Sequence, residues 1–496
     1  MNVRKIKKIL VANRGEIAIR IMRTAREMQI KTVAIFSEAD QQAPHVAFAD
    51  EAVCVGPAPS AQSYLNMDKI IAVCKELNVD AIHPGYGFLS ENAAFAKKVA
   101  DKGIIFIGPS ADAIEVMGDK LAAKNAVSKY NVPMVPGVNH AIVDLEEAKT
   151  TAKEIGFPVL IKASAGGGGK GMRVVENADE IEEQMQRAMS EAESAFGNKS
   201  VFIEKFITSP RHIEIQIIGD QHGNIVHLFE RDCSIQRRHQ KVIEEAPSSL
   251  LTEEKRKAMG EAAIGVAKAC NYYGAGTVEF IVDENVDFFF LEMNTRLQVE
   301  HPVTEEITGI DLVKEQIHIA EGKPLSFKQE DLSIHGHAME VRVYAENPRE
   351  NFLPETGTLQ TYVPPQGPGI RVDDGFKEGL AIPIYYDPMI SKLITYGANR
   401  EQARVRMLRA IEEYHITGVS TTLDFCAFAL NHEAFTSGKF DTKFVEKHFR
   451  PELLDEDNPE EEEVAIAFAA QILVQESSGG IPLPKGDSKW KLRNRD

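Results

Sequence analysis

The chain of 496 residues contains 43% hydrophobic and 26% charged residues, proportions that exclude disorder along most of its length. Its formal net charge of −18 disfavours nucleic acid and anionic membrane surfaces as general partners. The longest apolar-rich stretch, VAIAFAAQILV, is shorter than the ~20 residues of a membrane span, and the N-terminal apolar run is too short for a signal peptide. Five scattered cysteines fit neither a disulfide framework nor a zinc site. We therefore expect a cytoplasmic protein with no membrane or nucleic-acid partner.

The first part of the sequence alternates short β-rich runs with helical patterns. The runs KKILVA, TVAIFS, DAIHPG and IIFIGPS are separated by segments such as GEIAIRIMRTAREM, an order typical of β-α-β units on a parallel sheet. We expect this sheet to end near Pro109. Gly15 is the only glycine in the first strand-to-helix turn, so the turn lacks the G-x-G-x-x-G spacing of a dinucleotide-binding fold.

A glycine-containing turn, HPGYGFLSEN at residues 83–92, follows one of these predicted strands. Ligands of open α/β sheets bind at the carboxyl ends of strands, so the turn is a candidate ligand site. A turn whose glycines serve only its geometry is the other interpretation.

A glycine-rich loop, SAGGGGKGM at residues 164–172, follows the apolar run FPVLIKA. Such a tract brings backbone N–H groups close to phosphate oxygens, and Lys170 adds positive charge, although a flexible linker has the same composition. The loop is not a Walker A motif, because Lys170 is followed by Gly171. Lys162 ends the preceding strand, where it needs either an anionic partner or a route to solvent.

The clearest chemical pattern is VEFIVDENVDFFFLEMN, residues 278–294. A turn near Asn285 predicts a hairpin that sets Glu279 opposite Glu292. Two carboxylates roughly 5 Å apart on one sheet face repel each other, and a hard cation such as Mg²⁺ relieves the repulsion. The sequence therefore predicts a metal site at this pair.

Polar residues alternate beyond the hairpin at Glu292, Asn294, Arg296, Gln298 and Glu300. Extended backbone would direct the whole set to one side. At ~3.3 Å per residue, a straight strand would separate its two ends by about 26 Å. The chain must therefore bend, or the two ends serve separate steps; a solvated strand face is the other interpretation.

The segment ERDCSIQRRHQK, residues 230–241, is basic in an otherwise acidic protein. Its cationic residues are Arg231, Arg237, Arg238, His239 and Lys241. They indicate either a site for an anionic ligand or a basic surface patch. The acidic stretch LLDEDNPEEEE, residues 453–463, has linker composition and marks the end of the main body.

Together these segments resemble the biotin carboxylase family of the ATP-grasp superfamily. The matching runs occur in family order over roughly residues 4–450: ILVANRGEIAIRI, HPGYGFLSEN, FIGPS, MGDK, KASAGGGGKGM, PRHIEIQ, ERDCSIQRRHQK, EMNTRLQVEHPVTE and GHAMEVRVYAENP. The resemblance implies an α/β fold. Its expected parts are a Rossmann-like parallel-sheet N-terminal domain at 1–116, a helical connector at 117–133, an ATP-grasp lid at 134–206, an ATP-grasp core with a C-terminal α+β domain at 207–450, and an acidic linker and tail at 451–496.

The resemblance also implies an ATP-dependent carbon–nitrogen ligase that uses Mg²⁺ or Mn²⁺, with two metal sites. In that chemistry ATP phosphorylates bicarbonate to carboxyphosphate, which breaks down to CO₂ and phosphate, and N1′ of biotin captures the CO₂. The glycine loop would then let a lid close over the triphosphate and open to release ADP.

The family's site residues carry over to matching positions of this sequence. The implied ATP contacts are Lys120, Lys162, His212, Gln236 and His239, with Gly168 and Gly169 over the phosphates and Glu204, Lys205, Phe206 and Ile207 at the adenine. The implied metal ligands are Glu279, Glu292 and Asn294. For the other substrates, Lys241, Arg296 and the backbone of Val299 would hold bicarbonate, Glu300 would be the base, and Arg342 would stabilise the enolate-like oxygen of biotin.

The sequence has no AMKM-like biotinylation motif and no carboxyltransferase domain. The resemblance therefore implies a separate biotin carboxyl carrier protein and a separate carboxyltransferase subunit. We expect a component of a multi-subunit acyl-CoA carboxylase that acts on acetyl-CoA, as in fatty acid biosynthesis, or on propionyl-CoA; the biotin carboxylase subunit of a two-subunit pyruvate carboxylase is the alternative. Family members are commonly homodimers. Another ATP-grasp ligase that passes carboxyphosphate to ammonia, and a catalytically silent nucleotide-binding scaffold, are competing hypotheses.

Overall fold

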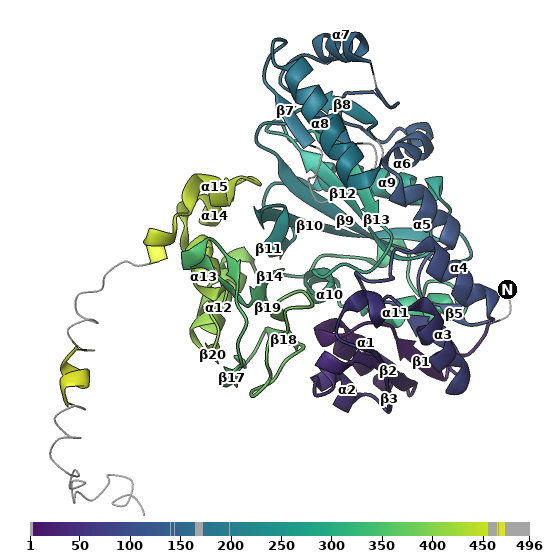
Figure 1. Ribbon diagram of the computed structural model, residues 1–496, viewed down its shortest axis with the longest axis vertical. Coiled ribbons are helices and arrows are strands. Elements are labelled where there is room, and N and C mark those ends of the chain that lie inside the picture. The colour runs from purple at the N-terminus through teal and green to yellow at the C-terminus, as the bar shows by residue number, and fades with distance from the viewer. Residues whose placement is uncertain are drawn as a thin grey trace, which may run out of the picture. The chain divides into compact units, whose positions relative to one another are not determined.

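The computed structural model describes residues 3–138, 140–142, 144–163, 172–197, 199–454, 464 and 466–471. The chain divides into two units, Met1–Phe449 and Arg450–Asp496. Within the first unit, the described residues form three larger sheets and two two-stranded ribbons, and Figure 1 shows helices packed against the larger sheets. Most of the predicted glycine loop, residues 164–171, lies outside the described residues.

The N-terminal part of the first unit is the parallel sheet that the sequence predicts. Its strand order is β3-β2-β1-β4-β5, and every pairing is parallel. The strands are β1 (Lys8–Val11), β2 (Lys31–Ser37), β3 (Glu51–Gly56), β4 (Ala81–His83) and β5 (Ile105–Phe106). The helices are α1 (Gly15–Glu27), α2 (Pro44–Phe48), α3 (Met67–Glu76), α4 (Ala93–Asp101) and α5 (Ala111–Gly118), with 3-10 turns η1 (Glu38–Asp40) and η2 (Ser60–Gln62).

Both faces of this sheet are buried, which explains its nearly continuous apolar strands. Ile9 and Val11 of β1 belong to one core cluster with Ile17 of α1. Leu10, between them, belongs to the cluster on the other face with Phe95 of α4. The alternation fixes the first strand and holds the turn into α1 at the carboxyl end of the sheet.

A second, three-stranded antiparallel sheet has the order β7-β6-β8 and its own apolar core. Its strands are β6 (Val159–Ala163), β7 (Met172–Val175) and β8 (Val201–Lys205). Helices α7 (Leu145–Ile155) and α8 (Ile181–Phe196) contribute to that core and lie with this sheet at the top of Figure 1. Helix α6 (Lys120–Val127) and the 3-10 turn η3 (Ser128–Tyr130) precede it.

The largest sheet has eight strands in the order β13-β12-β9-β10-β11-β14-β19-β18. They are β9 (Arg211–Gly219), β10 (Ile225–Arg237), β11 (Gln240–Ala246), β12 (Gly274–Val282), β13 (Phe288–Asn294), β14 (His337–Tyr344), β18 (Ile370–Asp374) and β19 (Met389–Gly397). The antiparallel pairing of β11 with β14 joins segments that are far apart in the sequence. Site residues from both segments therefore lie on one sheet.

The remaining elements surround this sheet. The helices are α9 (Glu253–Ala269), α10 (His301–Thr308), α11 (Leu312–Ala320), α12 (Arg400–Glu412), α13 (Leu423–Asn431), α14 (Glu433–Thr436) and α15 (Phe444–His448), with 3-10 turns η4 (Gln329–Asp331) and η5 (Pro348–Glu350). Two short ribbons pair β15 (Glu346–Asn347) with β16 (Leu353–Pro354) and β17 (Thr361–Val363) with β20 (His415–Thr417). Val303 and Ile307 of α10 pack on Ala246, Ala338 and Ile394, which fixes the start of α10 over β11, β14 and β19.

In the second unit, the described residues are 450–454, 464 and 466–471. They include a 3-10 turn, η6 (Pro451–Leu454), and helical residues at 464 and 466–471, where Ile466 and Phe468 are exposed. Across the described parts of the chain, no helix combines the length and the apolar character that crossing a membrane requires.

Gly375 provides a test of how the C-terminal strands meet α1. A Cβ atom at this position would lie 2.6 Å from the backbone N of Glu16 and 2.8 Å from Cα of Gly15. We expect Gly375→Ala to lower the free energy of unfolding by about 1–3 kcal/mol, because backbone must move to admit the methyl group. Chemical denaturation measures the change.

Gly118→Ala is the matched control, because a Cβ there meets no atom within 4 Å. We expect that variant to equal the wild type or to be more stable by about 0.5–1 kcal/mol. Equal stability of Gly375→Ala and the wild type would show that the approach of Gly375 to α1 is unimportant.

Candidate active site

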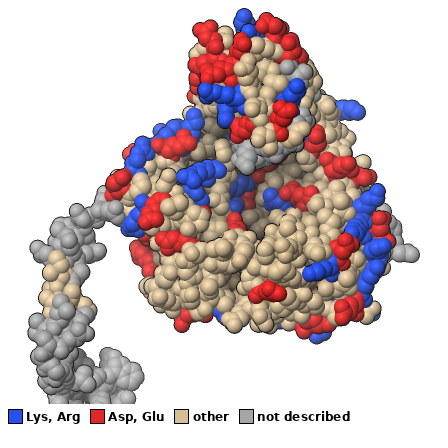
Figure 2. Space-filling view, viewed as in Figure 1, with Lys and Arg blue, Asp and Glu red and all other residues tan. Residues whose placement is uncertain are grey.

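A cavity of about 770 Å³ lies where the N-terminal sheet meets the eight-stranded sheet. The turns after β1 and β4 contribute residues 13–17 and 86–88, so the HPGYGFLSEN turn does line a cavity at the carboxyl ends of parallel strands. The predicted site residues that line it are His212, His239, Lys241, Glu279, Glu292, Asn294, Arg296, Val299 and Arg342. Figure 2 shows a hollow in the first unit with charged side chains of both signs inside it.

Glu279 and Glu292 lie opposite each other on β12 and β13, as the predicted hairpin requires. Burial and the neighbouring Glu279 raise the pKa of Glu292, which is the expected result of repulsion between the two carboxylates. The amide of Asn294 lies 2.9 Å from Glu279. Two carboxylates and an amide are hard oxygen ligands, so this donor set fits Mg²⁺ or Mn²⁺.

Lys241 lies among three carboxylates at one side of the cavity, and we call this cluster, together with Arg342, the cavity floor. Its Nζ lies 2.6 Å from Glu214, 2.6 Å from Glu300 and 3.1 Å from Glu279. Burial would lower the pKa of Lys241, but the three carboxylates outweigh burial and raise it well above its ordinary value. In turn, burial would raise the pKa values of Glu279 and Glu300, but Lys241 is the first of the cations that lower both. These pKa shifts favour the ionised forms of Lys241, Glu279 and Glu300.

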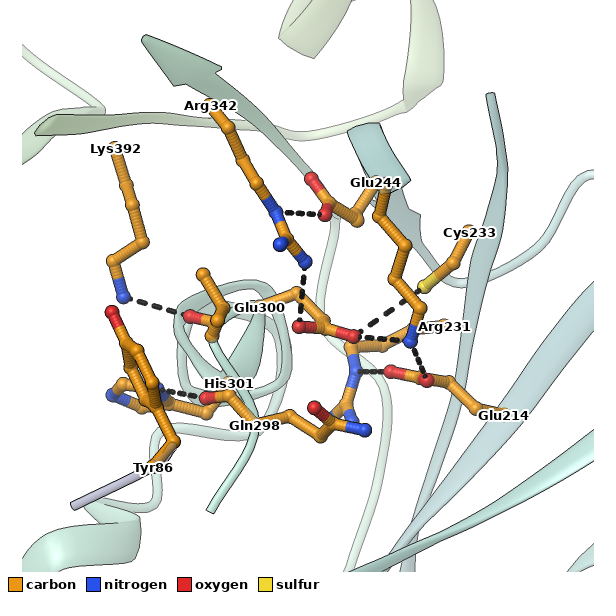
Figure 3. A network of polar contacts seen from close by, with 12 residues as sticks. Tyr86, Glu214, Arg231, Cys233, Glu244, Gln298, Glu300, His301, Arg342 and Lys392 are labelled. Carbon is orange, nitrogen blue, oxygen red and sulfur yellow. Dashed lines mark hydrogen bonds and ion pairs between the residues drawn. The ribbon is translucent and has the colours of Figure 1, made fainter. Parts of the chain in front are cut away.

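Glu300 and Arg342 are in direct contact at the start of α10. Glu300 is fully buried; one of its oxygens accepts a hydrogen bond from Lys241, and the other accepts one from Nη2 of Arg342 at 3.0 Å. Nε of Arg342 donates to Glu244 at 2.6 Å. Figure 3 shows Arg342 between these two carboxylates. The predicted base and the predicted biotin contact thus belong to one network.

The chain bends after β13, which ends at Asn294. Arg296 bridges this bend: its Nη2 donates to Asn294 at 3.0 Å, its Nη1 to Gln298 at 2.6 Å and its Nε to Glu91 at 2.8 Å. Gln298 in turn donates to Glu279 at 3.2 Å. The alternating polar residues therefore converge on the cavity, and a solvated strand face is wrong.

The predicted nucleotide residues on the three-stranded sheet form a separate cluster. Lys162 of β6 lies 2.6 Å from Glu204 of β8, and Lys124 contacts the same buried carboxylate. Lys162 thus has an anionic partner within the protein and is largely buried. The Nζ of Lys205 donates to the backbone carbonyls of Gly156 and Phe157 at 2.8 and 2.9 Å, and its backbone N–H donates to the carbonyl of Pro136 at 2.7 Å.

The other predicted nucleotide contacts that the structure describes, apart from His212 and His239, are not among the residues that line the cavity. Lys120 begins α6, and its charge acts on Glu292. Gln236 lies 3.0 Å from Nδ1 of His212. Phe206 and Ile207 follow β8 and are partly buried. Gly168 and Gly169 lie outside the described residues.

Three cations of the basic segment, Arg231, Arg237 and Lys241, are largely buried, so the surface-patch interpretation is wrong for these three, whereas Arg238 and His239 are exposed. Arg231 is fully buried and donates to Glu214 at 2.6 Å. Arg237 pairs with Glu346 at 2.6 Å. Arg238 and His239 occupy the turn between β10 and β11 and line the cavity. The segment supplies cations to the site from both strands and from the turn.

Several residues of the network were missed by reasoning from the sequence: Glu91, Glu214, Glu244 and Lys392. The Nζ of Lys392 donates to the carbonyl of Val299 at 2.7 Å and lies 3.4 Å from Glu16. Glu91 stands within HPGYGFLSEN, and Glu214 within the apolar strand HIEIQ. A charged residue inside a strand that otherwise reads as core was the available signal for Glu214 and Lys392.

Three family models match successive parts of the chain. The biotin carboxylase N-terminal domain matches residues 5–114, the ATP-binding domain of the carbamoyl-phosphate synthase L chain matches residues 119–328, and the biotin carboxylase C-terminal domain matches residues 340–447.

Similar proteins match over most of this chain. Biotin carboxylase 1 of Bacillus subtilis is 54% identical over 444 residues, which are 89% of this chain and 99% of that protein. The mitochondrial propionyl-CoA carboxylase alpha chain of Sus scrofa is 54% identical over 90% of this chain, but the match spans 61% of that longer protein. The biotin carboxylase domain dimer of Hydrogenobacter thermophilus 2-oxoglutarate carboxylase, solved with MgADP, ADP and bicarbonate, has a TM-score of 0.86 and 48% identity over 92% of this chain and 100% of that chain. The chain therefore belongs to the biotin carboxylase family of ATP-dependent ligases.

Proposed function

We propose that this chain carboxylates biotin with bicarbonate and ATP, and that the biotin is attached to a separate biotin carboxyl carrier protein. The observation that supports this most strongly is the contact of Glu300 with Lys241 and Arg342 at the cavity floor. An ionised carboxylate between two cations offers a base beside groups that attract an anionic substrate.

In this proposal Arg296, Lys241 and the backbone of Val299 hold bicarbonate. A planar guanidinium presents paired donors that match two carbonate oxygens. Bicarbonate bound to Lys241 competes with Glu300 for the ammonium protons. Because the ammonium is what lowers the pKa of Glu300 most, substrate binding makes Glu300 a stronger base.

Glu300 then takes the proton of bicarbonate, and a bicarbonate oxygen bonds to the γ-phosphorus as the bond to ADP breaks. Carboxyphosphate breaks down to CO₂ and phosphate, and N1′ of biotin bonds to the CO₂. The phosphate released from carboxyphosphate takes the proton of N1′, and negative charge develops on the ureido oxygen as that proton leaves. Arg342 donates to that oxygen and stabilises the charge.

ATP is the second substrate of the proposed reaction. Its contacts would be Lys120, Lys162, His212, Gln236 and His239, with Glu204, Lys205, Phe206 and Ile207 at the adenine and Gly168 and Gly169 over the phosphates. Glu279, Glu292 and Asn294 would hold Mg²⁺ or Mn²⁺, which screens phosphate charge when bound. For Lys162 to reach a phosphate, it must leave Glu204, which Lys124 continues to neutralise.

The expected division of labour along the chain is part of this proposal. Residues 134–206 would act as the lid, since their three-stranded sheet has its own core and can move as a body. Residues 1–116, the connector 117–133 and residues 207–450 would form the remainder of the site, and residues 451–496 would be a linker and tail.

For the assembly, we propose a homodimeric biotin carboxylase component of a multi-subunit acyl-CoA carboxylase with a separate carboxyltransferase subunit. The likeness to a propionyl-CoA carboxylase alpha chain supports an acyl-CoA acceptor, and the dimeric relative supports the homodimer. The likeness to a 2-oxoglutarate carboxylase domain keeps a keto-acid acceptor, as in a two-subunit pyruvate carboxylase, as the alternative.

Glu300→Gln tests the base. We expect biotin-dependent ADP release to fall by about 100-fold or more, because a lost general base removes roughly 10²–10⁴ of the rate. The assay uses the full chain with MgATP, bicarbonate and free biotin. Glu321→Gln, a change at a buried carboxylate that contacts Ile6 and Lys323, is the control and should keep normal turnover.

Each other outcome of that assay favours a competing hypothesis. Unchanged turnover in Glu300→Gln would rule out its role as base. ADP release that depends on ammonia rather than biotin would favour another ATP-grasp ligase. No ADP release by the wild type would favour a silent scaffold.

Arg296→Lys tests the guanidinium fork. We expect the KM for bicarbonate to rise about tenfold or more, because lysine keeps the charge but cannot contact Asn294, Gln298 and Glu91 together. Arg409→Lys is the control, since Arg409 forms an exposed pair with Glu413. Wild-type kinetics in Arg296→Lys would remove Arg296 from bicarbonate binding.

The final acceptor is tested by reconstitution. With biotinylated carriers and carboxyltransferases of acyl-CoA carboxylases, we expect labelled carboxylate to reach acetyl-CoA or propionyl-CoA. Matched components of a pyruvate carboxylase serve as the comparison. Transfer to pyruvate alone would favour the alternative assembly.

A further inference from the structure

Glu244 and Glu340 form a buried pair of carboxyl groups behind Arg342. They lie opposite each other on β11 and β14, so both side chains are on the same face of the sheet. Both residues have 0% exposure. Oε2 of Glu244 and both oxygens of Glu340 lack a hydrogen-bond partner among the described residues, while Oε1 of Glu244 accepts from Arg342.

Charged groups from four elements act on Glu340. They are Glu244 of β11, Arg342 of β14, Lys392 of β19, which lies opposite Arg342, and Glu300 at the start of α10. Burial and the charge of Glu244 raise the pKa of the Cys426 thiol, which lies on α13.

The contacts of the three carboxyl groups decide which one carries a proton. The cations of this network are Arg342, Lys392 and Lys241, but Lys241 contacts Glu300, and Lys392 contacts the carbonyl of Val299 and lies 3.4 Å from Glu16. A buried charge without a partner is strongly unfavourable. Among the three carboxyl groups, Glu300 has two cationic partners, Glu244 has one, and Glu340 has no hydrogen-bond partner within the described structure. Glu340 is therefore the group that takes the proton.

We propose that Glu340 is a positioning residue that stays protonated in the working enzyme and donates its O–H to the free oxygen of Glu244. This hydrogen bond holds Glu244 as the ionised acceptor of Arg342, and so orients the guanidinium toward the ureido oxygen of biotin. The effect on catalysis rests on the role proposed above for Arg342. The protonation state of Glu340 is independent of that role.

The titration behaviour of the pair agrees with this assignment. Burial raises the pKa of Glu340 well above its ordinary value, and Glu244 adds to that effect. Burial also raises the pKa of Glu244, to about 7, although Arg342 opposes the shift. Glu340 therefore keeps its proton at neutral pH, whereas Glu244 loses its proton around neutral pH.

A neutral Glu340 changes how stability depends on pH. A glutamate in the unfolded chain has a pKa of about 4.3, so folding takes up one proton at neutral pH. The stabilising contribution of that proton is complete below the unfolded pKa and is lost as pH rises toward the folded pKa. Glu340→Gln keeps a neutral donor and removes this loss. Above about pH 5, the ratio of the folding equilibrium constant of Glu340→Gln to that of the wild type should rise by up to about tenfold for each pH unit.

The kinetics of Glu340→Gln and Glu340→Met distinguish the effect of the hydrogen-bond donor at position 340 from the effect of side-chain volume. Glutamine keeps a donor, so turnover should stay within about twofold of the wild type. Methionine has similar size and no donor, so kcat/KM for biotin should fall about tenfold while the KM for ATP is unchanged. Glu321→Gln is the matched control for stability, because it loses an ion pair with Lys323 and should gain no stability as pH rises.

Infrared spectroscopy of the full chain provides an independent measurement. The carbonyl band of a protonated carboxylic acid should be present in the wild type at neutral pH and reduced in Glu340→Gln. No difference in that band, no pH-dependent gain in stability, or equal kcat/KM in the Gln and Met variants would overturn the proposal. If the wild type releases no biotin-dependent ADP, the proposed function fails, whereas the band and the stability curve still decide the protonation of Glu340.

Discussion

Burial of carboxylates next to cations is the constraint on which the site depends. Lys241 contacts Glu214, Glu279 and Glu300, and these residues come from three separate segments of the chain. In a low-dielectric interior each of these carboxylates would be strongly unfavourable without the ammonium. The ion pairs thus do more than add stability: they determine which strands can lie side by side, and they hold reactive groups ionised in a place from which water is largely removed.

The eight-stranded sheet places these charged residues close enough to pair. Its middle strands carry the cations of the basic segment, the β12–β13 hairpin carries the facing carboxylates, and β14 brings Arg342 against Glu300. The N-terminal parallel sheet completes the cavity with the turns after β1 and β4. Each sheet supplies a different chemical class of contact, so either sheet alone would lack part of this site.

Local sequence patterns were sufficient to predict much of the fold and part of the site. The parallel sheet follows from alternating β-rich and helical runs, and the register of Glu279 with Glu292 follows from the position of one turn. The contacts of Arg296 with Glu91 and of Lys392 with Val299 were not predictable, because they join segments 205 and 93 residues apart and leave no local periodicity. The partner of Lys162 was missed for a related reason: cross-strand pairing of β6 with β8 is not encoded beside either residue. The roles of the individual site residues stay predictions.

The pairing of β11 with β14 has a consequence for how the chain folds. Glu300 and Glu244 precede Arg342 and Lys392 in the sequence, so during synthesis the carboxylates of the floor appear before two of the cations that balance them. Until β14 and β19 join the sheet, the site lacks Arg342 and Lys392. Contacts of such long sequence separation form late and slowly. A chain that ends before β19 therefore cannot form the complete site, so the site's charge balance depends on nearly the whole of the first unit.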